Sequence, residues 1–281
     1  FRLAERDKQV LMLCGMSAAF SAIFRTPIAA PVFAMEVVCV GAMRYAALVP
    51  CVLSALIANV ISSLFGVAST SFTLAAIPEL SAISLLQAIG LGIVFGALAS
   101  LFCRAMHIGG TLYKKIENPY LRIVVGGCIV ALLSLLVRSG DYNGAGMEVV
   151  ERAMSGQVRS WAWLLKLLFT AVTIGFGFKG GEVVPSFFVG ATFGCVFGGL
   201  LGLPPAFAAA VGLVAVFCGA VNCPIASVIL SVELFGAGGM AYFAAACAIS
   251  YLLSGYCGLY SSQTILYSKL KAEFINVHTH E

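Results

Sequence analysis

Residues 15–36 read GMSAAFSAIFRTPIAAPVFAME, and residues 212–233 read GLVAVFCGAVNCPIASVILSVE. A glycine, a phenylalanine, a Pro-Ile-Ala triplet and a final glutamate match at one offset, because 212 − 15 and 233 − 36 both equal 197. Alanine or isoleucine matches alone would carry no weight in so apolar a chain. Two structurally related halves are the usual build of secondary transporters, whose substrate site lies near the midplane between the halves. The repeat therefore predicts a duplicated membrane architecture.

The composition agrees with this prediction. Hydrophobic residues make up 61% of the 281 residues, charged residues make up 10%, and the mean hydropathy is +1.03. Soluble domains carry roughly a quarter charged residues. We therefore expect an all-α, polytopic membrane protein in which residues 1–281 form a single transmembrane domain without a soluble domain.

Apolar segments set the expected helices. They lie near 9–24, 27–42, 45–65, 84–106, 119–137, 160–176, 185–201, 205–221, 224–236 and 240–254, and a shorter helix is expected at about 260–272. Crossing a bilayer of ~30 Å takes about 20 apolar residues, so several segments are too short to cross. Short segments broken by Gly and Pro predict helices that penetrate the bilayer only partway.

The repeat divides the chain into residues 1–107, the remainder of a first half, and residues 119–272, a second half. The glycine-rich segment Gly175–Pro185 lies upstream of the second copy, and a shift by 197 places its counterpart before residue 1. We therefore expect that the chain lacks the start of its first half.

Charged residues predict the orientation through the positive-inside rule. The joint at 66–83 carries Glu79 and neither Lys nor Arg, so we place it outside the cell. We place in the cytoplasm a basic joint and the basic tail, which contain Arg104, Lys114, Lys115 and Arg122, and Lys269 and Lys271. These residues sit at span ends and form no single patch, so a nucleic-acid partner is not expected.

Enzyme chemistry finds no support in the sequence. The ten cysteines form no Cys-x-x-Cys pair, and they are expected to act as small buried hydrophobes. His107, His278 and His280 are expected at a span end or in the tail, so no metal site is expected. Motifs of zinc proteases, serine hydrolases and phosphate-binding loops are absent. We predict a protein that is not an enzyme and uses no cofactor.

The stretch Gly175-Phe-Gly-Phe-Lys-Gly-Gly-Glu-Val-Val-Pro185 precedes a helix with a glycine row at Gly190, Gly194 and Gly198. Proline suits the first turn of a helix, so the amides of Gly181, Glu182 and Val183 should point away from the helix start. Such amides, together with the helix dipole, bind anions. The glycine row would let neighbouring helices approach closely. A kinked packing helix is the alternative, and the residues alone favour neither.

Three acids lie within apolar segments, where ionisable residues are functional candidates. Glu36 and Glu233 share a repeat position, so a structural duty such as tying a helix end to a neighbour is favoured for both. Glu182 has no repeat partner. A carboxylate there would repel an anion unless it were protonated or engaged by a donor such as Lys179. Glu182, with Lys179, is therefore the candidate for coupling.

The segment Gly255-Tyr-Cys-Gly-Leu-Tyr-Ser-Ser-Gln-Thr-Ile-Leu-Tyr267 again follows a glycine turn. The hydroxyls of Tyr256, Tyr260 and Tyr267 could donate to an anion without adding charge. They could equally belong to an interfacial aromatic belt, and the residues alone favour the belt.

Taken with these motifs, the chain resembles the CLC family of chloride channels and proton-coupled anion transporters. The similarity rests on the Gly-Gly-x-x-x-Pro-(x)4-Gly-Ala-(x)2-Gly pattern at Gly180–Gly194, the repeated Pro-Ile-Ala helices that end in Glu, and Leu-Tyr-Ser-Ser-Gln at 259–263. It implies an inverted repeat and a homodimer with one pore per subunit. It also implies an anion held midway by the amides of Glu182 and Val183 and by the Tyr260 hydroxyl. The dimer contact would fall on the helices containing Pro27–Val40, Arg44–Leu64, Pro224–Phe235 and Met240–Ser254.

The resemblance also bears on the substrate. The family's serine-bearing loop and gating glutamate would lie before residue 1. Chloride/proton exchangers of the family carry a second glutamate where this chain has Val37, and most chloride members have an apolar residue where it has Glu182. The latter segment resembles the fluoride-exporting branch. The implied function is fluoride/proton antiport across a bacterial inner (plasma) membrane, and the alternative is a voltage-gated-type chloride channel or a chloride/proton antiporter. Fluoride or chloride ions, protons and the lipid bilayer are the expected partners.

Overall fold

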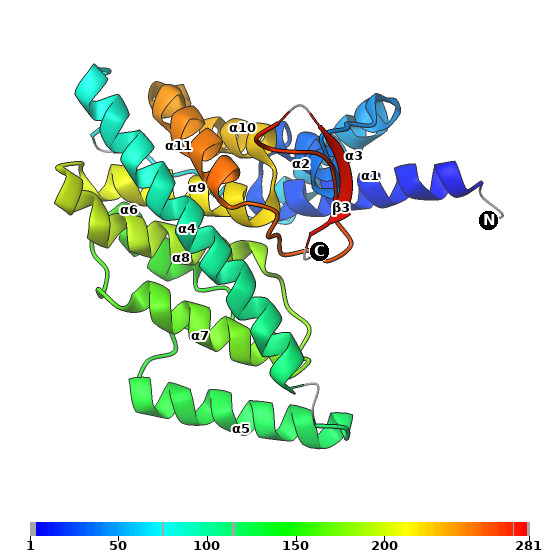
Figure 1. Cartoon of the computed structure of the whole chain (residues 1–281), viewed down its shortest axis with the longest axis vertical. Helices are drawn as coiled ribbons and strands as arrows, with labels where there is room; N and C mark the ends of the chain where they lie inside the picture. The colour runs from blue at the N-terminus through cyan, green and yellow to red at the C-terminus, as the bar shows by residue number, and fades with distance from the viewer. Residues whose placement is uncertain (1–3, 75, 114–115, 272, 280–281) are drawn as a thin grey trace.

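The computed structural model describes residues 4–74, 76–113, 116–271 and 273–279 (Figure 1). Within these residues the α-helices are α1 Glu5–Phe24, α2 Ala29–Val38, α3 Leu48–Leu64, α4 Ala82–Tyr113, α5 Pro119–Val137, α6 Met147–Met154, α7 Ala162–Gly175, α8 Val183–Gly198, α9 Pro205–Val221, α10 Pro224–Phe235 and α11 Met240–Leu253. Single 3-10 turns are η1 Tyr45–Ala47, η2 Gly199–Leu201 and η3 Ala237–Gly239. Three short strands are β1 Cys39–Val40, β2 Thr264–Tyr267 and β3 Phe274–His278.

Helix lengths fall into two classes. Within the described residues, four apolar helical stretches are long enough to cross a membrane: Tyr45–Leu64, Ala82–Thr111, Pro119–Val137 and Val183–Leu201. Other apolar helices, including α2 and α10, are only 10–17 residues long. At 1.5 Å per residue the ten residues of α2 extend about 15 Å, which is half of a bilayer core. The fold is therefore a mostly helical membrane architecture that mixes full and partial spans, as expected.

The core is built around α9. All of its residues from Phe207 to Val221 are buried, and α8, α4, α11 and α10 surround it (Figure 1). Glycines set the closest of these contacts. A Cβ added at Gly190 would lie 2.2 Å from the carbonyl oxygen of Gly212, and one at Gly194 would lie 2.2 Å from that of Ala208. The glycine row of α8 therefore packs directly on the α9 backbone.

The two repeat copies adopt equivalent local structures. Helices α1 and α2 correspond to α9 and α10, and each first helix ends at a residue in the left-handed conformation. That residue is Arg25, with φ 59°, after α1 and Asn222, with φ 58°, after α9. Non-glycine residues seldom adopt this conformation. Its recurrence at the offset 222 − 25 = 197 shows that the two copies share their backbone turn as well as their residues.

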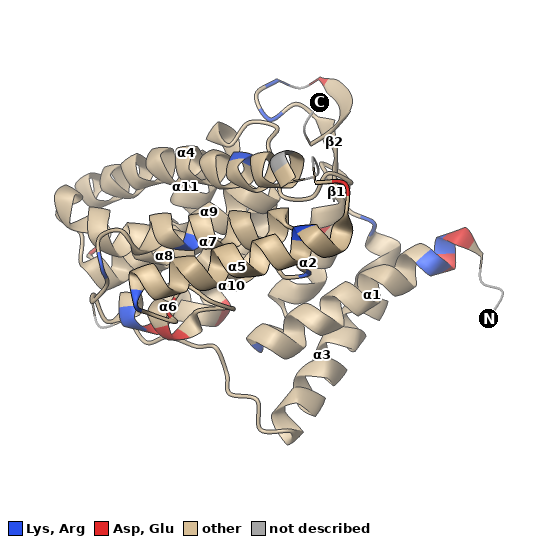
Figure 2. Cartoon of the chain, turned by 90° about the horizontal axis from the view of Figure 1, so that it is seen from below, with Lys and Arg blue, Asp and Glu red and all other residues tan. Residues whose placement is uncertain are grey.

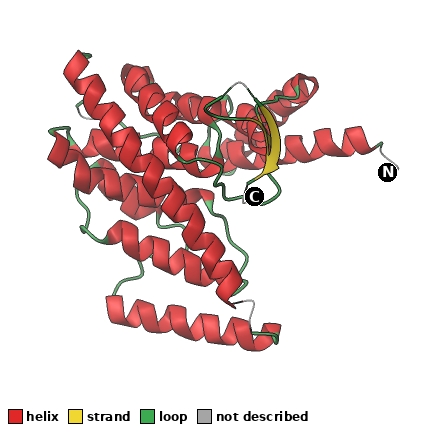
Figure 3. Ribbon diagram, viewed as in Figure 1, coloured by secondary structure: helices red, strands yellow, loops and turns green. Residues whose placement is uncertain are grey.

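The prediction of a helix at about 260–272 is wrong, and so is the prediction that every element is helical. Residues 264–267 form β2, which pairs in parallel with β1 and antiparallel with β3. Figure 3 shows strand and loop, not helix, near the C-terminus. The side chain of Gln263 explains the change. Its Nε2 donates to the carbonyl oxygens of Val37 and Val221, both at 2.8 Å, and so fixes this segment in extended form beside the end of α2. The last residue of the predicted helix, Ala272, lies outside the described residues.

The sequence analysis did not predict helix α6. This short helix carries Glu148, Glu151 and Arg152, while Val149, Val150, Ala153 and Met154 are buried. A search for long apolar segments cannot find an amphipathic helix of eight residues.

Charged side chains gather near helix ends and in connecting loops, and long stretches of helix carry none (Figure 2). Helix α4 has 32 residues, so the loop before it and the basic joint after it lie at opposite ends of a full span. This separation agrees with the predicted placement of the two joints on opposite sides. Which of these sides is the cytoplasm stays a prediction, and Lys114, Lys115 and His280 lie outside the described residues.

Candidate functional site

The start of α8 lies partly buried at the end of a glycine-rich turn. Gly177 adopts φ 96°, a conformation that favours glycine, and it lets the chain reverse after α7. Helix α8 then begins at Val183, and Pro185 occupies its first turn. The backbone amides of Glu182, Val183 and Val184 donate no hydrogen bond to another described residue. These free donors at a helix start are what an anion site requires.

Glu182 occupies the cap position of α8, where it is partly buried, and its side chain makes no capping hydrogen bond. No ion pair between described residues joins it to Lys179, which is exposed and lines a cavity together with Gly180 and Gly181. The coupling role of Glu182 and Lys179 stays a prediction.

Tyr260 lies close enough to Glu182 for the two side chains to interact electrostatically, although 78 residues separate them. Two contacts fix the Tyr260 backbone: its carbonyl oxygen accepts from the Gln263 amide at 2.9 Å and from the Thr279 hydroxyl at 2.6 Å. These contacts fix the Tyr260 backbone within electrostatic reach of Glu182. That Gly181, Glu182, Val183 and Tyr260 form one anion site stays a prediction.

The other two tyrosines lie elsewhere. Tyr256 is exposed, and its hydroxyl shares a hydrogen bond of 2.9 Å with the hydroxyl of Ser268. Tyr267 is exposed on β2. Neither contributes to the region around Glu182.

Glu36 and Glu233 make matching contacts across the repeat. The Glu36 carboxylate accepts from the backbone amides of Ile225, at 3.1 Å, and Ala226, at 2.8 Å. The Glu233 carboxylate accepts from those of Ile28, at 3.0 Å, and Ala29, at 2.7 Å. Each acid therefore caps the Pro-Ile-Ala helix of the opposite copy, where the helix dipole favours negative charge.

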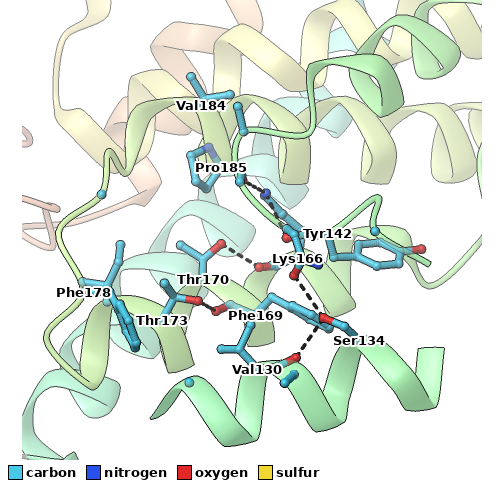
Figure 4. A pocket seen from close by; sticks show the side chains of 18 of the residues that line it. Val130, Ser134, Tyr142, Lys166, Phe169, Thr170, Thr173, Phe178, Val184 and Pro185 are labelled. Carbon is cyan, nitrogen blue, oxygen red and sulfur yellow. Dashed lines mark hydrogen bonds between the residues drawn. The ribbon is translucent and has the colours of Figure 1, made fainter. Parts of the chain in front are cut away.

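Sequence reasoning missed a cavity of about 1240 Å³ between α5, α7 and the start of α8 (Figure 4). Arg138, Lys166 and Lys179 line it, and no Asp or Glu is among its lining residues. The ammonium group of Lys166 is buried at its wall. A lysine inside the apolar segment 160–176 was the available signal, because the search for ionisable residues at membrane depth considered acids alone.

The described residues include no group of three or more His, Cys, Asp or Glu side chains that could hold a metal ion. All ten cysteines are free thiols, and most are buried or partly buried. Cys128, on α5, is exposed and departs from the expected burial.

Comparison with known proteins places this geometry in a family. Residues 1–255 match the family model described as voltage gated chloride channel. A chloride/fluoride channel protein of Pseudomonas syringae pv. tomato is 38% identical over 276 residues, which cover 96% of this chain and 61% of that protein. The chain thus spans about three fifths of the length of this relative.

Comparison with solved structures supports the same family. A CLC-type fluoride/proton antiporter matches with a TM-score of 0.88 and 33% identity, covering 91% of this chain and 65% of that one. A slow cyanobacterial Cl⁻/H⁺ antiporter has the same fold, with a TM-score of 0.71 at 18% identity over 90% of this chain and 63% of that one. The chain is therefore a multi-pass membrane protein that belongs to the CLC, or voltage gated chloride channel, family.

Proposed function

We propose that the protein containing this chain exchanges fluoride for protons, with the anion bound at the start of α8. The observation that carries the proposal is the set of free amides at the α8 start beside Glu182, whose carboxyl group lies within electrostatic reach of Tyr260. Two relatives support it by their names, a chloride/fluoride channel protein and a CLC-type fluoride/proton antiporter.

The chemistry of the site suits fluoride. Fluoride is small and strongly hydrated, so a site that accepts it must replace its water with short, strong hydrogen bonds. The amides of Glu182 and Val183 supply two donors, and the Tyr260 hydroxyl supplies a third. A protonated Glu182 adds a fourth, whereas its charged form repels the ion. The affinity of the site for fluoride would then depend on the protonation of Glu182, which couples fluoride transport to protons.

Chloride transport, by a channel or by a chloride/proton antiporter, is the alternative. The same amides and hydroxyl would also bind chloride, and the name of the Pseudomonas syringae relative includes chloride. Chloride gives up its water more readily, so a chloride site has less need of a titratable donor. The two functions therefore differ in what Glu182 does.

The test uses the natural full-length protein in liposomes, with fluoride and chloride efflux measured by ion-selective electrodes under an imposed and then a collapsed proton gradient. We expect fluoride efflux to exceed chloride efflux and to follow the proton gradient. Glu182→Gln should lose this coupling, while Glu79→Gln, which removes an exposed loop carboxylate, should keep it. Equal chloride efflux, or unchanged coupling in Glu182→Gln, would refute the fluoride assignment.

Assembly and location complete the proposal. The chain would form one transmembrane domain of two repeat halves, in a homodimer in the bacterial inner membrane. Apolar side chains exposed on α3 and α11, among them Val49, Leu53, Ile57 and Leu253, give the proposed dimer face. Cross-linking of single-cysteine variants on these helices would show whether two copies meet there.

A further inference from the structure

Lys166, on α7, is a buried cation that the proposed site does not use. Only 1% of its surface is exposed. Its Nζ donates to the carbonyl oxygens of Gly144, at 2.6 Å, and Tyr142, at 3.3 Å, and lies 5.1 Å from the centre of the Phe188 ring. Among the described residues, no carboxylate forms an ion pair with it.

A charge in this position acts over a long range. Carbonyl dipoles and an aromatic face solvate the ammonium, but they do not neutralise its charge. Asp141, an acid in the adjoining loop, pairs instead with Arg152 at 2.9 Å. Interactions between charges weaken slowly with distance where water is scarce. The positive potential of Lys166 therefore extends into the space beside it.

The cavity in Figure 4 connects this charge with the anion site. Lys166 forms part of its wall together with Gly180, Gly181, Val184 and Pro185, which belong to the turn and first helical residues at the α8 start. The buried ammonium and the amide-bearing helix start thus face one space. Its other cations, Arg138 and Lys179, add to a potential of the same sign.

We propose that Lys166 is a positioning residue whose fixed positive charge raises anion occupancy at the start of α8, through the cavity between α5, α7 and α8. The inference rests on the proposed anion transport, but it holds for either fluoride or chloride. Lys166 would touch neither the ion nor its proton. It would lower the concentration of anion at which transport reaches half its maximum.

A purely structural role is the competing explanation, because the same ammonium ties the loop at Tyr142 and Gly144 to α7. Two substitutions separate the explanations. Lys166→Gln keeps a hydrogen-bond donor and removes the charge, whereas Lys166→Arg keeps the charge and changes the donor geometry. Lys8→Gln is the matched control, since it removes one exposed positive charge at the start of α1.

The measurement is the dependence of efflux rate on anion concentration, fluoride and chloride in turn, for the full-length protein in liposomes. For Lys166→Gln we expect the half-saturating concentration to rise about five- to tenfold, with a similar maximal rate and an unchanged thermal midpoint in detergent. Lys166→Arg and Lys8→Gln should stay within twofold of the unsubstituted protein.

An unchanged half-saturating concentration in Lys166→Gln would overturn the inference, as would an equal rise in Lys166→Arg. If Lys166→Gln does not assemble, Lys166→Met is measured under the same criterion. Absence of anion flux in the unsubstituted protein would instead refute the proposed function, so the two failures are distinguishable.

Discussion

Replacing Glu36 by glutamine tests the reciprocal caps between α2 and α10. The carboxylate of Glu36 is buried and accepts from two amides, those of Ile225 and Ala226. Glutamine has one acceptor oxygen, and its NH₂ group would face the second amide. A buried N–H left without an acceptor costs about 1–3 kcal/mol, and loss of charge weakens the remaining bond by about 1 kcal/mol. We expect a destabilisation of about 2–4 kcal/mol.

Glu233→Gln makes an internal comparison. Its carboxylate accepts from the equivalent amides of Ile28 and Ala29 but is only partly buried, so water can replace the lost acceptor. We expect a smaller loss of about 1–2 kcal/mol.

Thermal unfolding of the full-length protein in detergent, followed by loss of the monodisperse peak in gel filtration, measures both losses. At roughly 2–4 °C per kcal/mol, Glu36→Gln should lower the midpoint by about 4–16 °C, and Glu233→Gln by about half as much. Anion selectivity of the protein that remains assembled should not change. A well-assembled Glu36→Gln protein with a normal midpoint and lost ion coupling would refute the structural assignment.

Three further predictions follow from close contacts and from the site. Gly190→Ala should sharply reduce the yield of assembled protein, because the added methyl group would meet the Gly212 carbonyl oxygen. Gly15→Ala is the control and should not reduce the yield, because a Cβ there has no atom within 4 Å. Gel filtration after identical expression compares the two variants. Tyr260→Phe should weaken anion binding by about 0.5–1.5 kcal/mol, or roughly two- to tenfold, as titration calorimetry would measure; an unchanged affinity would remove Tyr260 from the site. Gln263→Ala should remove the hydrogen bonds to Val37 and Val221, so the backbone amides of the C-terminal strands should exchange hydrogen faster. The amides of α9 should stay protected. Unchanged protection of the strand amides would contradict the role of the Gln263 side chain.

The duplicated elements were predictable from sequence because strong local signals define them. Both repeat copies could be predicted from the sequence, because each has a proline near its helix start, a glutamate near its helix end and the same offset of 197. The glycine row of α8 likewise predicted close packing, since few other reasons place three glycines at a spacing of four. What the repeat could not supply was the reciprocity of the caps, because a sequence does not show which helix start each carboxylate reaches.

The helix prediction for residues 260–272 was wrong for a physical reason. Residues 260–272 contain helix-compatible Leu and Lys, and no local signal forbids a helix. The strand pairing depends on Gln263 reaching carbonyl oxygens at 37 and 221, contacts that span 226 and 42 residues along the chain. Tertiary hydrogen bonds therefore overrode local propensity. Lys166 could have been found as a lysine inside an apolar segment, but only the folded chain shows that its partners are backbone carbonyls.

The reciprocal caps also constrain the order in which the protein can fold during its synthesis. The amide of Ile28 leaves the ribosome 205 residues before its acceptor, Glu233, is made. At about 5–20 residues per second this delay is roughly 10–40 s. During that time the start of α2 cannot rest in lipid without an unpaired N–H, which costs several kcal/mol in hydrocarbon. Until the second copy is synthesised, the insertion machinery or water must therefore supply an acceptor for this N–H. A chain truncated before residue 233 should be a target for membrane proteases.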